Sequence, residues 1–276
     1  MPLTFASRIA FTYPAGEQTL HANFHADDTG FYFASSGTVF AFSTAGVRES
    51  SRDVTLSNHP TGTIWGFTRD SNGQWVTMQR TTGTGVIGRI GIYDEDGFPV
   101  HVTNVPDVVT GVNQVSTAFR APKAIVEVDG NYYVRVVRST IGNMRFLKFD
   151  STGDVQTDDL VVSESDPTSL SDAASNGIQN IFIIQQNEHR AYAVNAENFQ
   201  IISNLQTDLD SQNTAPWAAS AHGDTLYVAD RGGYVYRYTG VPDTRVSTAK
   251  KGTGLGLIQA LSLNAMLGRN MRRDDR

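Results

Sequence analysis

The 276-residue chain contains no cysteine. It therefore has no disulfide, no thiolate metal site and no cysteine nucleophile, and its stability must come from burial and hydrogen bonding. No stretch approaches the roughly 18 uninterrupted apolar residues of a membrane-spanning helix. Residues 1–16 also lack the basic start and the apolar run of a signal peptide. From these absences we expect a soluble protein that is made in the cytoplasm and has no membrane span.

Signatures of common enzymes and cofactor sites are missing as well. The chain has no G-x-S-x-G elbow, P-loop or H-E-x-x-H motif. A literal G-x-G-x-x-G at Gly83–Gly88 leads into a strand-like run, whereas a dinucleotide site requires the N-terminus of a helix. Asp94–Gly97 resembles part of a calcium loop, but Thr103 stands where the bidentate glutamate belongs, so we interpret the segment as a charged hairpin tip. We expect no cofactor, no metal and no enzymatic activity.

Two histidines, His21 and His25, have the four-residue spacing of a helical metal pair. On a strand, however, this spacing separates them by about 13 Å. We therefore interpret them as half-exposed strand residues and not as metal ligands.

Charge is unevenly distributed along the chain. Residues 249–276 contain six basic and two acidic residues, so their net charge is +4. Because the whole chain has a net charge of −6, the first 248 residues have a net charge of −10. An acidic body of this kind argues against nucleic-acid binding. We therefore predict two parts, a folded domain of residues 1–248 and a basic tail of residues 249–276.

Two kinds of turn alternate along residues 20–245. The first precedes a strand-like run and occurs at Asp28–Gly30, Asp70–Gly73, Asp129–Gly130, Asn176–Gly177 and Gly223–Asp224. The second ends an alternating apolar run and occurs at Phe40–Gly46, Ile92–Gly97, Phe146–Gly153, Tyr192–Asn198 and Tyr234–Gly240, with spacings of 51, 56, 45 and 42 residues. Glycine and asparagine supply the positive φ that tight hairpins require.

Two hairpins in a fixed order give one four-stranded antiparallel sheet per unit, which is the pattern of a propeller blade. The five units predict an all-β, five-bladed β-propeller, with a six-bladed ring as the main alternative and a two-sheet sandwich as a third. The fifth unit lacks an outer strand, and Arg8–Tyr13 form a strand-like run outside every unit, so we expect residues 5–14 to pair with this blade. We predict that this N-terminal strand completes the last blade and closes the ring.

The last unit also carries a family resemblance. Its segment His222–Asp230, followed by Tyr234–Tyr238, resembles the NHL-like and WD40-like propeller repeats, in which a D-x-x-G turn leads into a strand of the form L-Y-V-A-D. The resemblance extends over residues 20–245 as a pattern and is close in this last unit alone. It implies an architecture and not an activity.

The tail contains the one convincing helical pattern, residues 257–267, after a glycine-rich hinge. Its apolar face has three possible positions: on the propeller itself, in a groove of another protein or another copy, or on a membrane surface. For docking on a partner, we expect contacts from Leu257, Ile258, Leu261, Met266, Arg269, Arg272 and Arg273.

Four basic residues fall between the second and third predicted strands of their units: Arg80, Arg138, His189 and Arg231. One interpretation is a positive ring at the channel mouth that binds an anion or an acidic partner. The favoured alternative is that these side chains are solvated or pair with acidic neighbours.

Together these features predict a non-enzymatic propeller that serves as a structural, protein-interaction module of a larger assembly. The concrete form that we predict is a bacteriophage virion protein of the tail or capsid, with other proteins, copies of itself or a surface glycan as partners. The alternatives are a glycan-binding, receptor-recognition protein and a propeller enzyme of the lactonase or glycosidase type. Such an enzyme requires two or more carboxylates that converge at the channel mouth.

Overall fold

The computed structural model describes residues 3–11, 23–59, 64–83, 86–106, 119–138, 145–161, 172–178, 180–185 and 188–242. The chain divides into two compact units, Met1–Thr244 and Arg245–Arg276. The second unit, with the predicted helix and the seven tail residues from Leu257 to Arg273, lies outside the described residues. Within the described part, the search for a helix long and apolar enough to cross a membrane found none.

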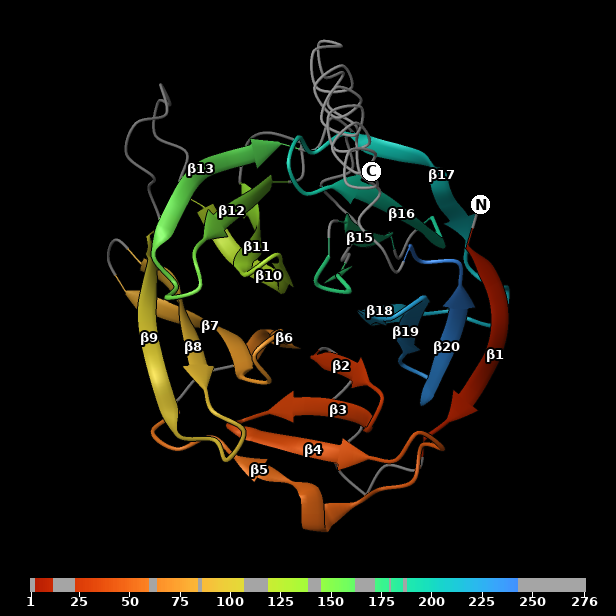
Figure 1. The fold of residues 1–276 in the computed structure, drawn as a ribbon, viewed down its shortest axis with the longest axis horizontal. Helices are drawn as coiled ribbons and strands as arrows, with labels where there is room; N and C mark the ends of the chain where they lie inside the picture. Colours follow the sequence, from red (N-terminus) through yellow and green to blue (C-terminus); the bar gives the residue numbers. More distant parts are fainter. Residues whose placement is uncertain are drawn as a thin grey trace, which may run out of the picture. The chain divides into compact units, whose positions relative to one another are not determined.

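The first unit consists of five four-stranded antiparallel sheets that follow one another around a ring (Figure 1). Blade 1 contains β2 (Phe24–Asp27), β3 (Gly30–Ser35), β4 (Thr38–Phe42) and β5 (Val54–Thr55), and blade 2 contains β6 (Ile64–Arg69), β7 (Trp75–Gly83), β8 (Val86–Tyr93) and β9 (Pro99–Pro106). Blade 3 contains β10 (Phe119–Val128), β11 (Asn131–Arg138), β12 (Arg145–Phe149) and β13 (Val155–Val161), and blade 4 contains β14 (Ala173–Ala174), β15 (Asn180–Gln185), β16 (Arg190–Asn195) and β17 (Ile201–Asp208). Blade 5 contains β18 (Pro216–His222), β19 (Thr225–Asp230), β20 (Tyr234–Thr239) and β1 (Thr4–Ala10). The prediction of an all-β, five-bladed β-propeller is confirmed.

Both turn signals occupy the connections that the repeat requires. The first kind joins the first and second strands of each blade, and the second kind follows the third strand. At Asp94–Gly97, the Asp94 carboxylate accepts hydrogen bonds from the amides of Asp96 (3.1 Å) and Phe98 (2.8 Å), and Gly97 has a φ of +88°. The aspartate and the glycine thus shape a tight turn between β8 and β9, as expected for a charged hairpin tip.

The N-terminal strand closes the ring as predicted. β1 pairs antiparallel with β20, from Thr4 opposite Thr239 to Ala10 opposite Tyr234. The following residue, Phe11, is buried with its ring centroid 5.1 Å from that of Phe31. Because β1 covers the edge of β20, the last blade obtains a fourth strand and the two ends of the ring are joined.

The hydrophobic core is divided among the spaces between neighbouring blades, which are filled by separate clusters of buried apolar side chains. Single polar bonds also link adjacent blades. The amide of Ala26 in β2 donates to Ser220 Oγ of β18 (2.9 Å), and Tyr132 donates to Asp70 across the junction of blades 2 and 3 (2.8 Å). These bonds satisfy buried polar groups that no sheet ladder reaches.

Candidate functional site

A cavity of about 470 Å³ opens where the inner strands of the ring end. The inner strands β2, β6, β10 and β18 face the centre of the ring in Figure 1, and β14 is the first strand of blade 4. All five blades contribute to the lining of this space, which we call the mouth cavity; its main polar members are Asp27, Arg69, Asp70, Glu127, Asn176 and His222. Among the described lining residues, the side chains of Ile178 and Ala221 alone are aliphatic. The mouth cavity is therefore a polar site with convergent hydrogen-bonding groups.

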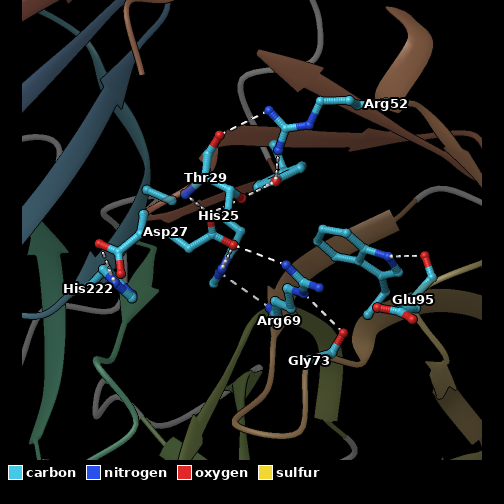
Figure 2. A network of polar contacts seen from close by, with 12 residues as sticks. His25, Asp27, Thr29, Arg52, Arg69, Gly73, Glu95 and His222 are labelled. Atoms are coloured by element: carbon cyan, nitrogen blue, oxygen red, sulfur yellow. Dashed lines mark hydrogen bonds and ion pairs between the residues drawn. The ribbon is translucent and has the colours of Figure 1, made fainter. Parts of the chain in front are cut away.

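Asp27, the last residue of β2, lies at the centre of one polar network (Figure 2). One carboxylate oxygen accepts bonds from the amide (2.7 Å) and the hydroxyl (2.6 Å) of Thr29, and the other lies 3.2 Å from Arg69 Nη1. Burial opposes ionisation of Asp27, but the bonds from Thr29, the neighbouring His25 and the charge of Arg69 outweigh it and lower its pKa. Asp27 is therefore an anion with a fixed cationic partner.

His25 is buried beside this ion pair. The backbone N–H of Arg69 donates to His25 Nδ1 (3.3 Å), which leaves the proton of the neutral ring on Nε2, 3.9 Å from Asp27. Burial lowers the pKa of His25 to about 4; the charge of Asp27 opposes this change, and those of Arg69 and His222 add to it. The ring is thus neutral near pH 7. The expectation of a half-exposed strand histidine is wrong for His25, because its side chain points into the channel; His21 lies outside the described residues.

Asp70 and Glu127 bring two further carboxylates to the mouth cavity. Asp70 accepts bonds from Tyr132 and from the amides of Asn72 (2.9 Å) and Gln74 (2.8 Å), so its oxygens stabilise the turn after β6. Glu127 is 6% exposed and accepts a bond from the amide of Gly130. Burial raises the pKa of Glu127, and the amide of Gly130 partly offsets that effect.

The remaining polar groups come from blades 4 and 5. His222 Nε2 lies 3.1 Å from the carboxylate of Asp28, and 39% of its side chain is exposed. Asn176 Nδ2 donates to the carbonyl of Pro242 (2.8 Å). Within the described ranges, no three His, Asp or Glu side chains come close enough together to hold a metal ion.

The four basic residues predicted to form a ring fall at the opposite end of the blades. Arg80 lies near the end of β7 and Arg138 is the last residue of β11, whereas His189 and Arg231 lie in connections between second and third strands. The mouth cavity forms at connections between first and second strands. The guanidinium of Arg231 stacks 3.5 Å above the ring of Trp217. The side chains of Arg80 and Arg138 lie outside the described part, and the ring remains a prediction.

Another titratable residue, Asp172, directly precedes β14. The amide of Ala219 in β18 donates to Asp172 (2.8 Å), so this carboxyl links blades 4 and 5. Burial raises the pKa of Asp172 to about 7, although the bonds from Ala219 and Ala173 and the charge of Arg135 act in the opposite direction. No motif in the sequence marked this residue.

Comparisons with known proteins indicate the fold and leave the activity open. No family model and no curated protein matches the chain. Among solved structures, the chain is similar to glutaminyl cyclase from Myxococcus xanthus, with 10% identity, a TM-score of 0.55, and coverage of 86% of this chain and 95% of the other. It also matches BamB from Moraxella catarrhalis, with 12% identity, a TM-score of 0.40, and coverage of 86% of this chain and 99% of the other. A third match is virginiamycin B lyase from Staphylococcus aureus, with 12% identity, a TM-score of 0.40, and coverage of 78% of this chain and 79% of the other. At 10% identity the first similarity supports the propeller architecture alone.

Proposed function

We propose that this propeller is a binding module of a larger assembly, and that its mouth cavity takes a small hydroxyl-rich group, such as the terminal sugar of a glycan on a partner. The observation that carries the proposal is the mouth cavity itself, to which every blade contributes polar groups. Its volume of about 470 Å³ falls in the range of small-molecule sites, which is roughly 300–1,000 Å³.

The pairing of charges favours a neutral polar ligand. Asp27 is neutralised by Arg69 at 3.2 Å, His222 faces Asp28 at 3.1 Å, and His25 is uncharged near pH 7. Donors and acceptors therefore stand side by side, and the oxygens of Asp70 and Glu127 add acceptors that are bonded to neutral groups. A sugar hydroxyl, which both donates and accepts a hydrogen bond, fits such a lining better than a simple anion.

Titration of the purified protein with a panel of neutral monosaccharides, together with a glycan array, tests the proposal. We expect His222→Ala and Glu127→Gln to weaken the binding of the selected sugar about tenfold, the effect of one lost hydrogen bond to a charged or polar partner. Arg190→Ala serves as the control, because this half-exposed arginine lies on β16, away from the mouth cavity. The proposal fails if no sugar binds, or if both mouth variants bind as tightly as the control.

A second candidate function, catalysis at the same place, is favoured by one observation. The pKa of Asp27 is lowered while that of Glu127 is raised, and two carboxyls with pKa values moved apart are typical of an acid and base pair. Turnover of chromogenic glycosides and lactones decides between the two functions. An enzyme loses turnover in Glu127→Gln while it still binds the substrate, whereas a binding module shows no turnover in either form.

The position of the protein in a bacteriophage virion remains a prediction from the sequence. Its direct test is mass spectrometry of purified virions from a lysate in which the protein is expressed. Absence from the particles removes this form of the assembly hypothesis and leaves the sugar-binding proposal untouched.

A further inference from the structure

The carboxylate of Asp27, which lines the mouth cavity, is held from two sides (Figure 2). One oxygen, Oδ1, accepts hydrogen bonds from the amide and the hydroxyl of Thr29, and the other, Oδ2, accepts from Arg69 Nη1 at 3.2 Å. His25 Nε2, 3.9 Å from Oδ2, is too far away for a hydrogen bond. A carboxylate has about four acceptor positions, so these three bonds leave one position for a group in the mouth cavity.

The hydroxyl of Thr29 belongs to a chain of hydrogen bonds that continues away from the cavity. The hydroxyl oxygens of Thr29 and Tyr32 lie 2.5 Å apart, and the Tyr32 oxygen accepts a bond from Arg52 Nη2. Arg52 Nη1 also donates to the backbone carbonyl of Thr29 (2.9 Å). Arg52 ends a short 3₁₀ turn, Ser50–Arg52, between the third and fourth strands of blade 1. None of these three residues is among the described residues that line the mouth cavity.

The chemistry of the groups fixes the direction of this chain. An ionised carboxylate can only accept, so the contact of 2.6 Å between Thr29 Oγ1 and Asp27 Oδ1 requires the hydroxyl proton of Thr29. Thr29 has no second hydroxyl proton, and Tyr32 therefore donates across the distance of 2.5 Å. A guanidinium can only donate, which makes the Tyr32 oxygen the acceptor for Arg52. Every bond from Arg52 to Asp27 thus points the same way, and hydrogen bonds in such a chain strengthen one another.

Arg69, which approaches the carboxylate from blade 2, is itself fixed. Its Nε donates to the carbonyl of Gly73 (3.0 Å), and its guanidinium lies 4.7 Å from the centre of the Trp75 ring. The indole N–H of Trp75 donates to the carbonyl of Glu95 (3.2 Å). Trp75 also packs on Tyr32, with ring centroids 5.0 Å apart, so the groups on the two sides of the carboxylate contact each other. The carboxylate between them is therefore preorganised by packing and by hydrogen bonds.

We propose that Tyr32 and Arg52 are positioning residues for Asp27, and that through Thr29 they fix its carboxylate in one orientation as the acceptor for a hydroxyl group of the sugar. This inference rests on the proposed function, because it names the group in the mouth cavity that selects a hydrogen-bond donor on the ligand. An acceptor that is already fixed loses no side-chain freedom when the sugar binds. That advantage increases the affinity roughly two- to tenfold.

The charges around Asp27 are consistent with this role. Burial raises its pKa, and the hydroxyl of Thr29 is the strongest of the influences that lower it. Among the described residues, the other charged or titratable groups that act on Asp27 or lie beside it are His25, Arg69, Arg52 and the pair of His222 and Asp28. Loss of the Thr29 hydroxyl therefore raises the pKa of Asp27, and as the pH falls the carboxylate takes up its proton at a higher pH.

Titration of the Asp27 carboxyl carbon by NMR in the full chain tests the positioning without any ligand, and Asp27→Asn assigns the signal. Thr29→Val removes one hydroxyl and keeps the amide, and Tyr32→Phe removes the next hydroxyl and keeps the ring. In both variants we expect Asp27 to take up its proton at a higher pH than in the natural protein. Because Tyr32 acts through Thr29, the double variant is expected to titrate like Thr29→Val alone. Tyr227→Phe is the matched control, since its ring packs on Phe31 (5.6 Å) outside this chain, and it leaves the titration unchanged.

Arg52→Lys separates position from charge. Lysine keeps the positive charge but lacks the planar fork that bonds the oxygens of Thr29 and Tyr32 together, so we expect a change in the same direction as for Tyr32→Phe. The variants are then titrated with the monosaccharide selected from the panel. Thr29→Val and Tyr32→Phe are expected to raise its dissociation constant roughly two- to tenfold, and Tyr227→Phe is not.

The outcomes separate this inference from the proposed function. The positioning role is overturned if Asp27 titrates in Tyr32→Phe or Arg52→Lys as it does in Tyr227→Phe, or if the double variant shows the sum of the single changes. Circular dichroism gives the pH at which each protein unfolds, and a carboxylate that stays ionised down to that pH in every variant has the same consequence. Equal sugar affinity in Tyr32→Phe and Tyr227→Phe overturns it too. If no monosaccharide binds, the proposed function fails, and the titration of Asp27 still decides whether Tyr32 and Arg52 position it.

Discussion

Replacement of Gly97 by alanine tests whether the repeat glycines hold neighbouring blades together. Gly97 has a φ of +88°, a conformation that costs an L-residue about 1–2 kcal/mol. It also packs on blade 1, where a Cβ atom would lie 2.3 Å from the carbonyl oxygen of Thr55 and 2.9 Å from Val54 Cγ1. The amide of Ser57 donates to the carbonyl of Gly97 (2.7 Å), so the backbone there cannot move away freely.

Gly130 provides a matched control for the conformational term. Its φ is +74°, but no atom lies within 4 Å of the position of a Cβ atom. Gly130→Ala is therefore expected to reduce the free energy of unfolding by about 1–2 kcal/mol. Gly97→Ala carries the same cost and an overpacking term of about 1–3 kcal/mol, for a total of roughly 2–5 kcal/mol.

Thermal and denaturant unfolding of the two variants measure this difference. For a domain of about 150–250 residues, each kcal/mol changes Tm by roughly 2–4 °C, so Gly97→Ala is expected to melt several degrees below Gly130→Ala. Equal losses in the two variants refute the reasoning. In that case the positive φ alone accounts for the loss of stability on Gly97→Ala, and the close contact with blade 1 adds nothing to it.

Two further substitutions test the closure of the ring and the titration of a buried carboxyl. Phe11→Ala is expected to lower the free energy of unfolding by about 3–5 kcal/mol, because it removes a ring that is 8% exposed and packs on Phe31 and Phe33. Phe5→Ala on β1, where the side chain is 39% exposed, is the control and is expected to cost less in the same denaturant series. Asp172 has a folded pKa of about 7 against an ordinary 3.8, so its contribution to stability is complete below pH 3.8 and is lost as the pH rises to 7. Asp172→Asn removes this loss of stability. Between pH 4 and pH 8 the free energy of unfolding of the variant is therefore expected to rise by about 1–3 kcal/mol relative to that of the natural protein, a figure that allows for partial exposure of the side chain. Tm of both proteins at both pH values measures this; a difference in Tm between the two proteins that is the same at pH 4 and pH 8 contradicts the raised pKa.

The fold was predictable from the sequence because its turns have strict chemical requirements. Asp94 and Gly97, or Asp70 and Gly73, combine a carboxylate that accepts backbone amides with a residue at positive φ, and few residue types satisfy either condition. These pairs recur at a spacing that one four-stranded blade explains. Residues 5–14 were assigned to the last blade because a strand-like run without a hairpin partner needs an edge to cover.

The mouth cavity was not predictable by the same means. Basic residues at equivalent positions in the repeat pointed to connections between second and third strands, such as those with His189 and Arg231. The mouth cavity lies at the other end of the blades and combines unlike residues. Distances between residues such as Asp27 and Arg69, 42 positions apart in sequence, depend on the closure and tilt of the blades, and local patterns contain neither quantity.

The repeat nevertheless contains the information that locates the mouth cavity, once repeated and unrepeated residues are separated. The first turn of each blade begins at Asp28, Asp70, Asp129, Asn176 or Gly223, and these residues shape the backbone. The residue directly before the turn differs from blade to blade: it is Asp27, Arg69, Val128, Ser175 or His222, and four of these five line the mouth cavity. Because a ring brings equivalent positions around one axis, these varying residues meet at the mouth cavity, beside two of the turn residues, Asp70 and Asn176. In a closed propeller, the positions next to a recurrent turn are therefore where a search for the ligand site should begin.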